Sequence, residues 1–273
     1  MEQIDYRLTD ILADPQESQK FHTEKLLYLS EGFLCYRPPG YSPPVTELPT
    51  IKNGYVTFAS FNNNCKIHSK MIALWSQILN ANEKSRLLLK FQAGADKNVS
   101  AHYLNQFESC GVSSDRIKIH GWKNPVEHLK LYNEVDLALD TFPYNGTTTT
   151  CEAMWMGVPT VSLVGKAHAS RVGLSILSRV GLQIFAASSP DEFVAKAISF
   201  SNQIEHLTAI RPALRSMMFN SPLCNAKTFA GNLENAYREM WHKWCRRQGI
   251  DIVDEKSGSN VRSGEMFANN EIS

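Results

Sequence analysis

The chain has 273 residues, 43% of them hydrophobic, which is enough for a sizeable core in one large or two small domains. Its 28 basic and 27 acidic residues nearly cancel, which argues against electrostatic binding to nucleic acid or to a membrane surface. No apolar run approaches the roughly 20 residues of a membrane-spanning helix, and no secretory signal pattern is present, so we predict a soluble, cytoplasmic protein. The six cysteines contain no C-x-x-C pair, which predicts mostly buried free thiols rather than disulfides or a metal site.

Residues 1–50 do not have the pattern of an independent domain. A short helical pattern occurs around residues 21–29, and the apolar Phe33, Leu34 and Tyr36 follow it. Prolines then stand at positions 38, 39, 43, 44 and 49. Because proline interrupts both helices and central strands, we expect an extended connector that lies along another part of the protein.

From Tyr55 onward, short apolar runs alternate with amphipathic segments. The runs predict six strands, at residues 55–60, 86–91, 117–120, 135–139, 161–164 and 183–186. The amphipathic segments predict helices at residues 69–79, 99–109, 126–132, 151–156 and 170–180. This alternation is typical of an α/β fold with a Rossmann-like, doubly wound parallel sheet. We assign residues 51–245 to this domain and expect a disordered polar tail at residues 246–273.

Ligands of such sheets bind beyond the carboxyl ends of the strands. After the strand at 135–139, the chain passes through Asn145-Gly146 into four consecutive threonines. The free amides at the start of a helix carry the positive end of the helix dipole, so residues 147–149 predict a phosphate site. Glu152, one turn later, is placed to accept hydrogen bonds from ribose hydroxyls. A threonine-capped helix that binds nothing explains these residues equally well.

Two further polar residues follow predicted strands. Lys66 closes the loop after the first strand, where its ammonium can reach a diphosphate, although a solvated surface lysine is the more common situation. His128 lies on a short helix, where an imidazole can stack on a base, although a lone helical histidine is more often structural. Neither G-x-G-x-x-G nor a P-loop occurs, which argues against a dinucleotide dehydrogenase and a P-loop NTPase, and GxSxG and HExxH are also absent.

Four stretches of the sequence carry a resemblance to a known family: FLCYRPP (33–39), FASFNNNCKI (58–67), DLALDTFPYNGTTTTCEAMWMGVPTVSL (136–163) and ASRVGLSIL (169–177). In this order they resemble the C-terminal catalytic half of the O-linked N-acetylglucosamine transferase and SPINDLY-like family. The resemblance covers roughly residues 5–245 and implies the nucleotide-sugar-binding lobe of a GT-B glycosyltransferase. It further implies transfer of N-acetylglucosamine from UDP-GlcNAc to Ser or Thr hydroxyls of proteins, with inversion and without a metal or other cofactor.

The resemblance also implies roles for individual residues. Lys66 matches the lysine that neutralises the donor diphosphate, which makes it the catalytic candidate, and Asn63 falls beside the same phosphates. His128 matches the histidine that contacts uracil. Thr147 departs from the histidine of animal members, and Glu152 is a longer acid than the aspartate often found on the ribose. The implied donor-binding residues are Asn63, Lys66, Lys123, His128, Thr147, Thr148, Thr149 and Glu152.

Members of this family also have an N-terminal catalytic lobe and tetratricopeptide repeats, neither of which we find in these 273 residues. The expected partners are therefore UDP-GlcNAc, a protein acceptor and a missing N-terminal lobe. Two alternatives stay open: a non-catalytic nucleotide-sugar-binding fragment or subunit, and a GDP-fucose-dependent protein O-fucosyltransferase. We predict that the chain alone binds UDP without transferring sugar, and that His168 serves donor contacts or loop structure rather than as a base facing an acceptor. We also predict that Trp241 or Trp244 is exposed on an apolar helical stripe.

Overall fold

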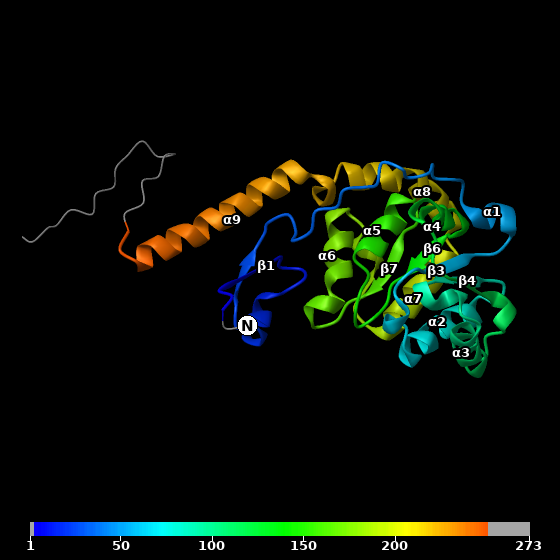
Figure 1. The fold of residues 1–273 in the computed structure, drawn as a ribbon. Helices are drawn as coiled ribbons and strands as arrows, with labels where there is room; N and C mark the ends of the chain where they lie inside the picture. Colours follow the sequence, from blue (N-terminus) through cyan, green and yellow to red (C-terminus); the bar gives the residue numbers. More distant parts are fainter. Residues whose placement is uncertain (1–2, 251–273) are drawn as a thin grey trace, which may run out of the picture. The chain divides into compact units, whose positions relative to one another are not determined.

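The computed structural model describes residues 3–250 (Figure 1). The chain forms two compact units that divide within its last helix, the first ending at Asn232 and the second beginning at Leu233. The strands of the main sheet are β3 (Thr57–Ser60), β4 (Arg86–Lys90), β5 (Ile117–His120), β6 (Leu137–Leu139), β7 (Thr160–Leu163) and β8 (Ala186–Ala187). The α-helices are α1 (Pro49–Asn53), α2 (Ser69–Ala81), α3 (Lys97–Ser109), α4 (Pro125–Leu131), α5 (Thr148–Trp155), α6 (Val172–Arg179), α7 (Pro190–Ser201), α8 (Ile204–Phe219) and α9 (Ala226–Arg247).

The main sheet is parallel throughout and has the strand order β5-β4-β3-β6-β7-β8. The chain starts at the centre with β3, proceeds outward to β5, and then crosses back to β6 and proceeds outward to β8. Helices α2, α3 and α7 cover one face of the sheet, and α4, α5 and α6 cover the other (Figure 1). The predicted doubly wound sheet is confirmed, and its winding reverses between β3 and β6, the point at which such sheets bind ligands.

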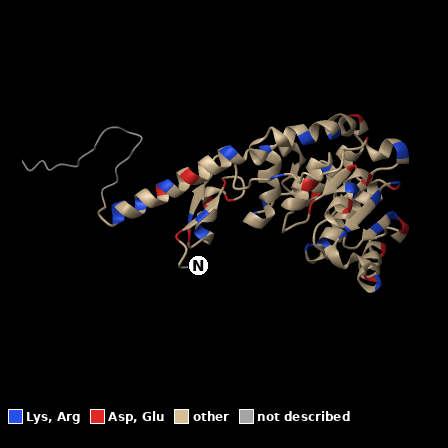
Figure 2. Cartoon of the chain, turned by 45° about the horizontal axis from the view of Figure 1, so that its top comes forward, with Lys and Arg blue, Asp and Glu red and all other residues tan. Residues whose placement is uncertain are grey.

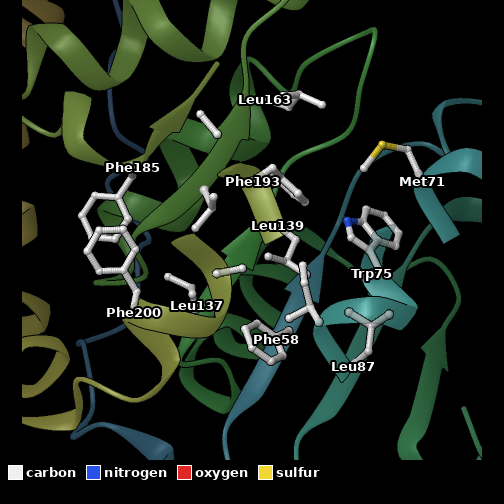
Figure 3. Packing of buried hydrophobic residues seen from close by; sticks show 14 of the residues in the cluster. Phe58, Met71, Trp75, Leu87, Leu137, Leu139, Leu163, Phe185, Phe193 and Phe200 are labelled. Carbon is white, nitrogen blue, oxygen red and sulfur yellow. The ribbon is translucent and has the colours of Figure 1, made fainter. Parts of the chain in front are cut away.

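Successive residues of a strand point to opposite faces of the sheet, and in β4 they belong to different apolar clusters. Leu87 of β4 belongs to the larger cluster, beneath α2 and α7, whereas Leu88 belongs to the smaller cluster on the other face. Figure 3 shows the larger cluster, with the fully buried indole of Trp75 among strand leucines. In the same cluster the rings of Phe185 and Phe200 stack with their centroids 4.2 Å apart. Packing on both faces fixes the strand ends that carry the site.

The N-terminal segment differs from the expected connector. Strands β1 (Tyr6–Thr9) and β2 (Lys25–Tyr28) form a small parallel sheet, so the helical pattern expected around residues 21–29 is wrong. The amide of Leu26 donates to the Gln19 side chain at 2.9 Å, which holds the start of β2 against the preceding turn. Pairing with β1 thus overrides the local helical pattern. Residues 30–48, which contain most of the prolines, form neither helix nor strand, as expected.

Three other elements depart from the sequence-based expectation. The strand expected at residues 183–186 is a 3-10 turn over Gln183–Phe185, followed by the short β8. Helices α7 and α8 were not predicted at all. The start of α7 does carry a recognisable signal, because the Ser189 hydroxyl accepts a hydrogen bond from the Glu192 amide at 3.2 Å and Pro190 follows the cap.

Helix α9 carries exposed aromatic residues in the second unit. Trp241 and Trp244 are 57% and 48% exposed, and their rings stack with centroids 5.1 Å apart, so the predicted exposure is confirmed. Of the predicted tail at residues 246–273, the part from residue 251 onward lies outside the described residues. No described helix is both long and apolar enough to span a bilayer.

The described cysteines are free thiols, as predicted. Cys151 and Cys245 are buried, whereas Cys35 and Cys65 are exposed, so the expectation of mostly buried thiols is wrong for part of the set. Burial raises the pKa of the Cys151 thiol far above its usual range. Cys151 therefore acts as a small apolar residue of the core.

Candidate functional site

The candidate site lies where the parallel strands end in their carboxyl direction, which we call the carboxyl edge; the opposite edge is the amino edge. Lys66 lies in a 3-10 turn, η2 (Asn64–Lys66), after β3. His128 lies on α4 after β5, and Glu152 lies on α5 after β6. Because β3 and β6 are hydrogen-bonded neighbours, the segments that follow them meet at the point where the winding reverses.

The turn from Asp140 to Gly146 is built around a buried carboxylate. Asp140 accepts hydrogen bonds from the amides of Thr141 at 2.8 Å and Gly146 at 2.6 Å, and from the Ser162 hydroxyl at 2.7 Å. Burial raises the pKa of this carboxyl to about 6, although the hydrogen bonds and the charge of Lys66 oppose the shift. Asp140 was not among the predicted site residues; its only signal was an acidic residue directly after a buried strand.

Two buried asparagines, also absent from the prediction, join the loops of the site. Asn145 donates to the carbonyl of Thr141 at 2.9 Å and accepts from the amide of Gly173 at 3.2 Å. Asn62 accepts a hydrogen bond from the Thr149 hydroxyl at 3.0 Å. The proton of that hydroxyl is therefore used within the protein, and Thr149 has only its backbone amide free for a phosphate.

Helix α5 begins at the predicted phosphate site. Within the part of the chain that the structure describes, the backbone amides of residues 147–150 have no hydrogen-bond partner. A Cβ at Gly146 would lie 2.9 Å from the Thr150 hydroxyl and closer still to that of Thr149, so the turn requires glycine. Thr148 is exposed and Thr147 half-buried, so solvent reaches these positions. Unpaired amides at the positive end of a helix dipole are suited to hold an anion.

Lys66 reaches across from the β3 side to the turn after β6. Its Nζ donates to the carbonyl of Asn145 at 3.0 Å and lies 4.0 Å from the centroid of the Tyr144 ring. Burial lowers the pKa of Lys66, and the charge of Asp140 opposes that shift. The structure thus brings Lys66 to the turn that leads into residues 147–149, as the sequence predicted.

His128 and Glu152 form a pair that the sequence did not predict. The imidazole Nε2 lies 2.9 Å from the Glu152 carboxylate, and the two side chains are only 12% and 18% exposed. The rings of Phe61 and Tyr132 lie 5.7 Å and 5.6 Å from that of His128. Glu152, expected to accept from ribose hydroxyls, therefore has one oxygen engaged by His128. The charge of Glu152 also acts on Lys90, a half-buried lysine at the end of β4. Burial lowers the pKa of Lys90, and the charge of Glu152 opposes that shift. Lys90 was not among the residues predicted for the site.

The other two candidates lie at the periphery. Asn63 is exposed, and its side-chain oxygen accepts from the amide of Cys65 at 3.1 Å, so it caps the turn that carries Lys66. Lys123 lies in the loop between β5 and α4. Its charge acts on His120, whose pKa is lowered first by burial and then by nearby lysines. Neither contacts the free amides or the Lys66 ammonium in this structure.

His168, in the loop after β7, is bound to the N-terminal segment. Its Nδ1 lies 2.8 Å from the Asp14 carboxylate, and the ring of Phe33 packs on it at 4.9 Å. Nearby, Arg171 donates to the carbonyl of Leu12 at 2.8 Å. These contacts anchor the small β1–β2 sheet to the loop, which agrees with a structural role for His168.

A cavity lies at the amino edge of the sheet, at the opposite end of the strands from Lys66 and residues 147–150. It has a volume of about 870 Å³, and Tyr55, Arg86, Lys118 and Glu134 belong to its lining. Arg86 lies 4.7 Å from the centre of the Tyr55 ring, and Lys118 forms an ion pair with Glu134 at 3.3 Å. In this cavity Lys118 is thus paired with Glu134, and Arg86 and Arg116 donate to backbone carbonyls.

In the described chain, the basic residues are not gathered into a broad surface that would attract an anion. Figure 2 shows basic and acidic residues interspersed along the described chain, in agreement with the net charge of +1. Among residues 3–250, no group of three His, Cys, Asp or Glu side chains is placed to hold a metal ion. A phosphate at the carboxyl edge therefore depends on the local donors, which are Lys66 and the amides of residues 147–150.

Comparison with solved structures places this fold among glycosyltransferases. The O-GlcNAc transferase of Thermobaculum terrenum, solved as a point mutant, superposes with a TM-score of 0.84 and 32% identity over 91% of this chain and 47% of its own. A sucrose-phosphate synthase from Thermosynechococcus elongatus, with a TM-score of 0.55 and 14% identity, covers 89% of this chain and 60% of its own and shares the fold alone. The chain has the Rossmann-like fold of one lobe of a GT-B glycosyltransferase.

Sequence comparison gives the family. A Hordeum vulgare protein described as a probable UDP-N-acetylglucosamine–peptide N-acetylglucosaminyltransferase SPINDLY is 41% identical over 268 residues, 94% of this chain and 28% of the relative. The SEC protein of Arabidopsis thaliana, with a corresponding description, is 28% identical over 90% of this chain and 26% of its own length. The chain thus spans less than a third of these relatives. The model of glycosyl transferase family 41 matches residues 47–233, and the chain belongs to that family.

Proposed function

We propose that this chain is the donor-binding part of a protein glycosyltransferase that uses UDP-N-acetylglucosamine. The observation that carries the proposal is the row of unpaired amides at residues 147–150 beside the Lys66 ammonium. Both features complement the negative charge of a diphosphate. The descriptions of the relatives as UDP-N-acetylglucosamine–peptide transferases support the sugar and the class of acceptor. The proposal includes no metal or other cofactor.

The proposed mechanism stabilises the leaving group. In an inverting transfer the acceptor oxygen bonds to the anomeric carbon while the bond from that carbon to the diphosphate breaks. Negative charge then moves onto UDP. Donors that are already oriented lower the barrier because they need no reorganisation during the reaction. In this proposal Lys66 and the amides of residues 147–150 supply those donors. His128, held by Glu152 and packed against the rings of Phe61 and Tyr132, offers a surface for the uracil base.

The acceptor side of the reaction is proposed to come from elsewhere in the full-length protein. This chain spans 26% to 30% of the length of its curated relatives. At the carboxyl edge, Glu152 is engaged by His128 and His168 by Asp14, which leaves neither well placed to take the acceptor proton. We therefore expect UDP binding without transfer to peptide by the isolated chain. The cytoplasmic location expected from the sequence stays a prediction.

Nucleotide binding by the purified chain tests the donor site. Calorimetric titrations with UDP, UDP-N-acetylglucosamine and GDP should give the tightest binding for the two uridine nucleotides. Saturating UDP should also slow hydrogen exchange at residues 147–150, because ligand oxygens would satisfy amides that are now unpaired. Tighter binding of GDP would favour the fucosyltransferase alternative. No binding of any of the three would contradict the proposal.

A transfer assay tests the division of labour. The chain is incubated with labelled UDP-N-acetylglucosamine and a Ser- and Thr-rich peptide pool, with and without the N-terminal lobe of a relative added in trans. We expect no labelled peptide from the chain alone, since acceptor positioning contributes several kcal/mol to such reactions. Product from the chain alone that Lys66→Ala abolishes would show that the acceptor site is built within these residues.

A further inference from the structure

The turn η2 anchors the backbone of Lys66, and the turn after β6 contacts its ammonium. Asn63 caps the turn η2, and the Tyr103 hydroxyl donates to the carbonyl of Asn64 at 3.1 Å, so the backbone before Lys66 is anchored. The side chain itself is long and flexible, and its ammonium contacts nothing else on η2. The turn after β6 orders the ammonium, because it supplies the Asn145 carbonyl and the Tyr144 ring.

The Tyr144 ring faces the ammonium from one side. The 4.0 Å separation between Nζ and the ring centroid is well within the range of a cation–π interaction. Among the described residues Lys66 forms no ion pair, and Asp140 acts on it only at longer range. An ammonium has three N–H groups. The Asn145 carbonyl takes one and the ring face covers another direction, so one N–H stays available for a ligand oxygen.

The backbone of Tyr144 is fixed independently of its ring. The Thr141 hydroxyl donates to the carbonyl of Tyr144 at 2.7 Å, and the next amide, that of Asn145, donates to the carbonyl of Ala169 at 2.8 Å. The side chain, by contrast, is 57% exposed. The ring can therefore be replaced without removing a hydrogen bond of the turn, so its effect on Lys66 can be measured separately from folding.

We propose that Tyr144 is a positioning residue whose ring holds the Lys66 ammonium in the place where it meets the donor diphosphate. The proposal rests on the proposed function, because Lys66 is the diphosphate ligand in both. The ring orders the flexible lysine before the nucleotide arrives, so less conformational freedom is lost on binding. The aromatic face of Tyr144, and not its hydroxyl, holds the ammonium.

The first experiment titrates UDP into three variants of the chain. Tyr144→Leu should weaken UDP binding about two- to fivefold, the range of an exposed cation–π contact. Tyr144→Phe keeps the ring and should bind like the wild type. Tyr237→Leu is the matched control, since Tyr237 is 56% exposed and lies in the second unit. Equal affinity of the Leu and Phe variants at position 144, with unchanged melting temperatures, would overturn the proposal.

A double-mutant cycle separates positioning from a general structural effect. In a Lys66→Met background, Tyr144→Leu should cause no further loss of UDP affinity, because the group it positions is gone. A loss in that background equal to the loss in the wild type would show that Tyr144 acts without Lys66, and the proposal would be wrong.

A third measurement does not depend on nucleotide binding. Protons on the ε-carbon of Lys66 should be shifted upfield in NMR spectra by the ring current of Tyr144. The shift should persist in Tyr144→Phe and vanish in Tyr144→Leu. Its absence from the wild type would overturn the proposed contact. If the shift is present and the wild type binds no UDP, the contact stands while the proposed function, and with it the positioning role, is refuted.

Discussion

The two edges of the main sheet differ in what their polar groups are bonded to. At the amino edge, the buried guanidinium of Arg211 donates to the carbonyls of Thr46, Val135 and Tyr132 at 2.7 to 3.3 Å. Asp136 beside it accepts from the amides of Thr50 and Thr57 at 2.9 and 2.8 Å. At the carboxyl edge, four consecutive amides at residues 147–150 have no partner within the described chain.

The volume of a cavity does not by itself locate a binding site in this molecule. The cavity of about 870 Å³ lies at the amino edge, yet Lys118 there already pairs with Glu134, and Arg86 and Arg116 already donate to backbone carbonyls. A ligand there would have to replace hydrogen bonds that exist, with little net gain. The pocket at the carboxyl edge is smaller, but the amides beside it have no partner in the described chain, so a ligand oxygen there displaces only water. We therefore expect substitutions at the amino edge to change stability and those at the carboxyl edge to change binding.

The largest effect is expected from removing the buried arginine of the amino edge. Arg211→Ala removes the donor to the buried Val135 carbonyl and leaves the Asp136 carboxylate without its nearby cation, which should lower the free energy of unfolding by about 3 to 5 kcal/mol. Urea denaturation followed by circular dichroism measures it. Arg238→Ala, at an exposed position, is the control and should change stability by less than about 0.5 kcal/mol. A loss below about 1 kcal/mol for Arg211→Ala would contradict the contrast between the edges.

The second prediction concerns the pH dependence of the carboxyl edge. Burial raises the pKa of Asp140 from 3.8 to about 6, so between these values the folded chain keeps a proton that the unfolded chain has released. The contribution of Asp140 to stability therefore falls as the pH rises from about 4 to about 6, by up to about 3 kcal/mol. Asp140→Asn removes this pH-dependent contribution. The free energy of unfolding of the variant, relative to that of the wild type, should therefore rise as the pH rises from about 4 to about 6.

Urea denaturation at four pH values between 4 and 7 checks the Asp140 prediction. Asp136, whose pKa burial also raises to about 6, is present in both proteins, so its titration cancels in the difference. A difference between variant and wild type that is independent of pH would mean that Asp140 ionises at its ordinary pKa. The polar turn of the carboxyl edge would then be less desolvated than its burial indicates.

The third prediction is a loss of binding without a loss of stability. Lys66→Ala removes a charge-assisted contact to the diphosphate and should weaken UDP binding by about 1.5 to 3 kcal/mol, or roughly 10- to 150-fold. Its melting temperature should stay close to that of the wild type, because the Lys66 side chain contributes one hydrogen bond and one contact with the exposed Tyr144 ring to the fold. Lys70→Ala, on the exposed start of α2, is the matched control. An unchanged dissociation constant would refute the role assigned to Lys66.

The smallest effect is expected in the amino-edge cavity. Arg86→Met removes an exposed guanidinium that stacks on the half-buried Tyr55 and bonds to the carbonyl of the exposed Asp115 at 3.3 Å. Stability should fall by less than about 1 kcal/mol, and the affinity for UDP should stay within about twofold of the wild type. A tenfold loss of UDP affinity would move the nucleotide site to this edge.

Much of the fold could be predicted because its signals are local. Apolar runs of strand length alternate with helical periodicity from Tyr55 onward, and this pattern alone indicates a parallel doubly wound sheet. The strand pattern indicated that Lys66 follows β3 and that the threonines follow β6. Both were expected at a site because ligands of such sheets bind at the carboxyl edge. Where the local pattern was weak or misleading, as in β2 and in helices α7 and α8, prediction failed.

Contacts between distant residues could not be predicted from the local pattern. That pattern does indicate which residue types reach the carboxyl edge, since strand and helix periodicity are properties of neighbouring residues. It did not determine that Glu152 pairs with His128, that Asn62 takes the Thr149 hydroxyl, or that Asp14 binds His168. These pairs join residues that lie 24, 87 and 154 positions apart. Such pairs form because packing of the sheet and its helices brings the side chains together, and no local pattern records that packing.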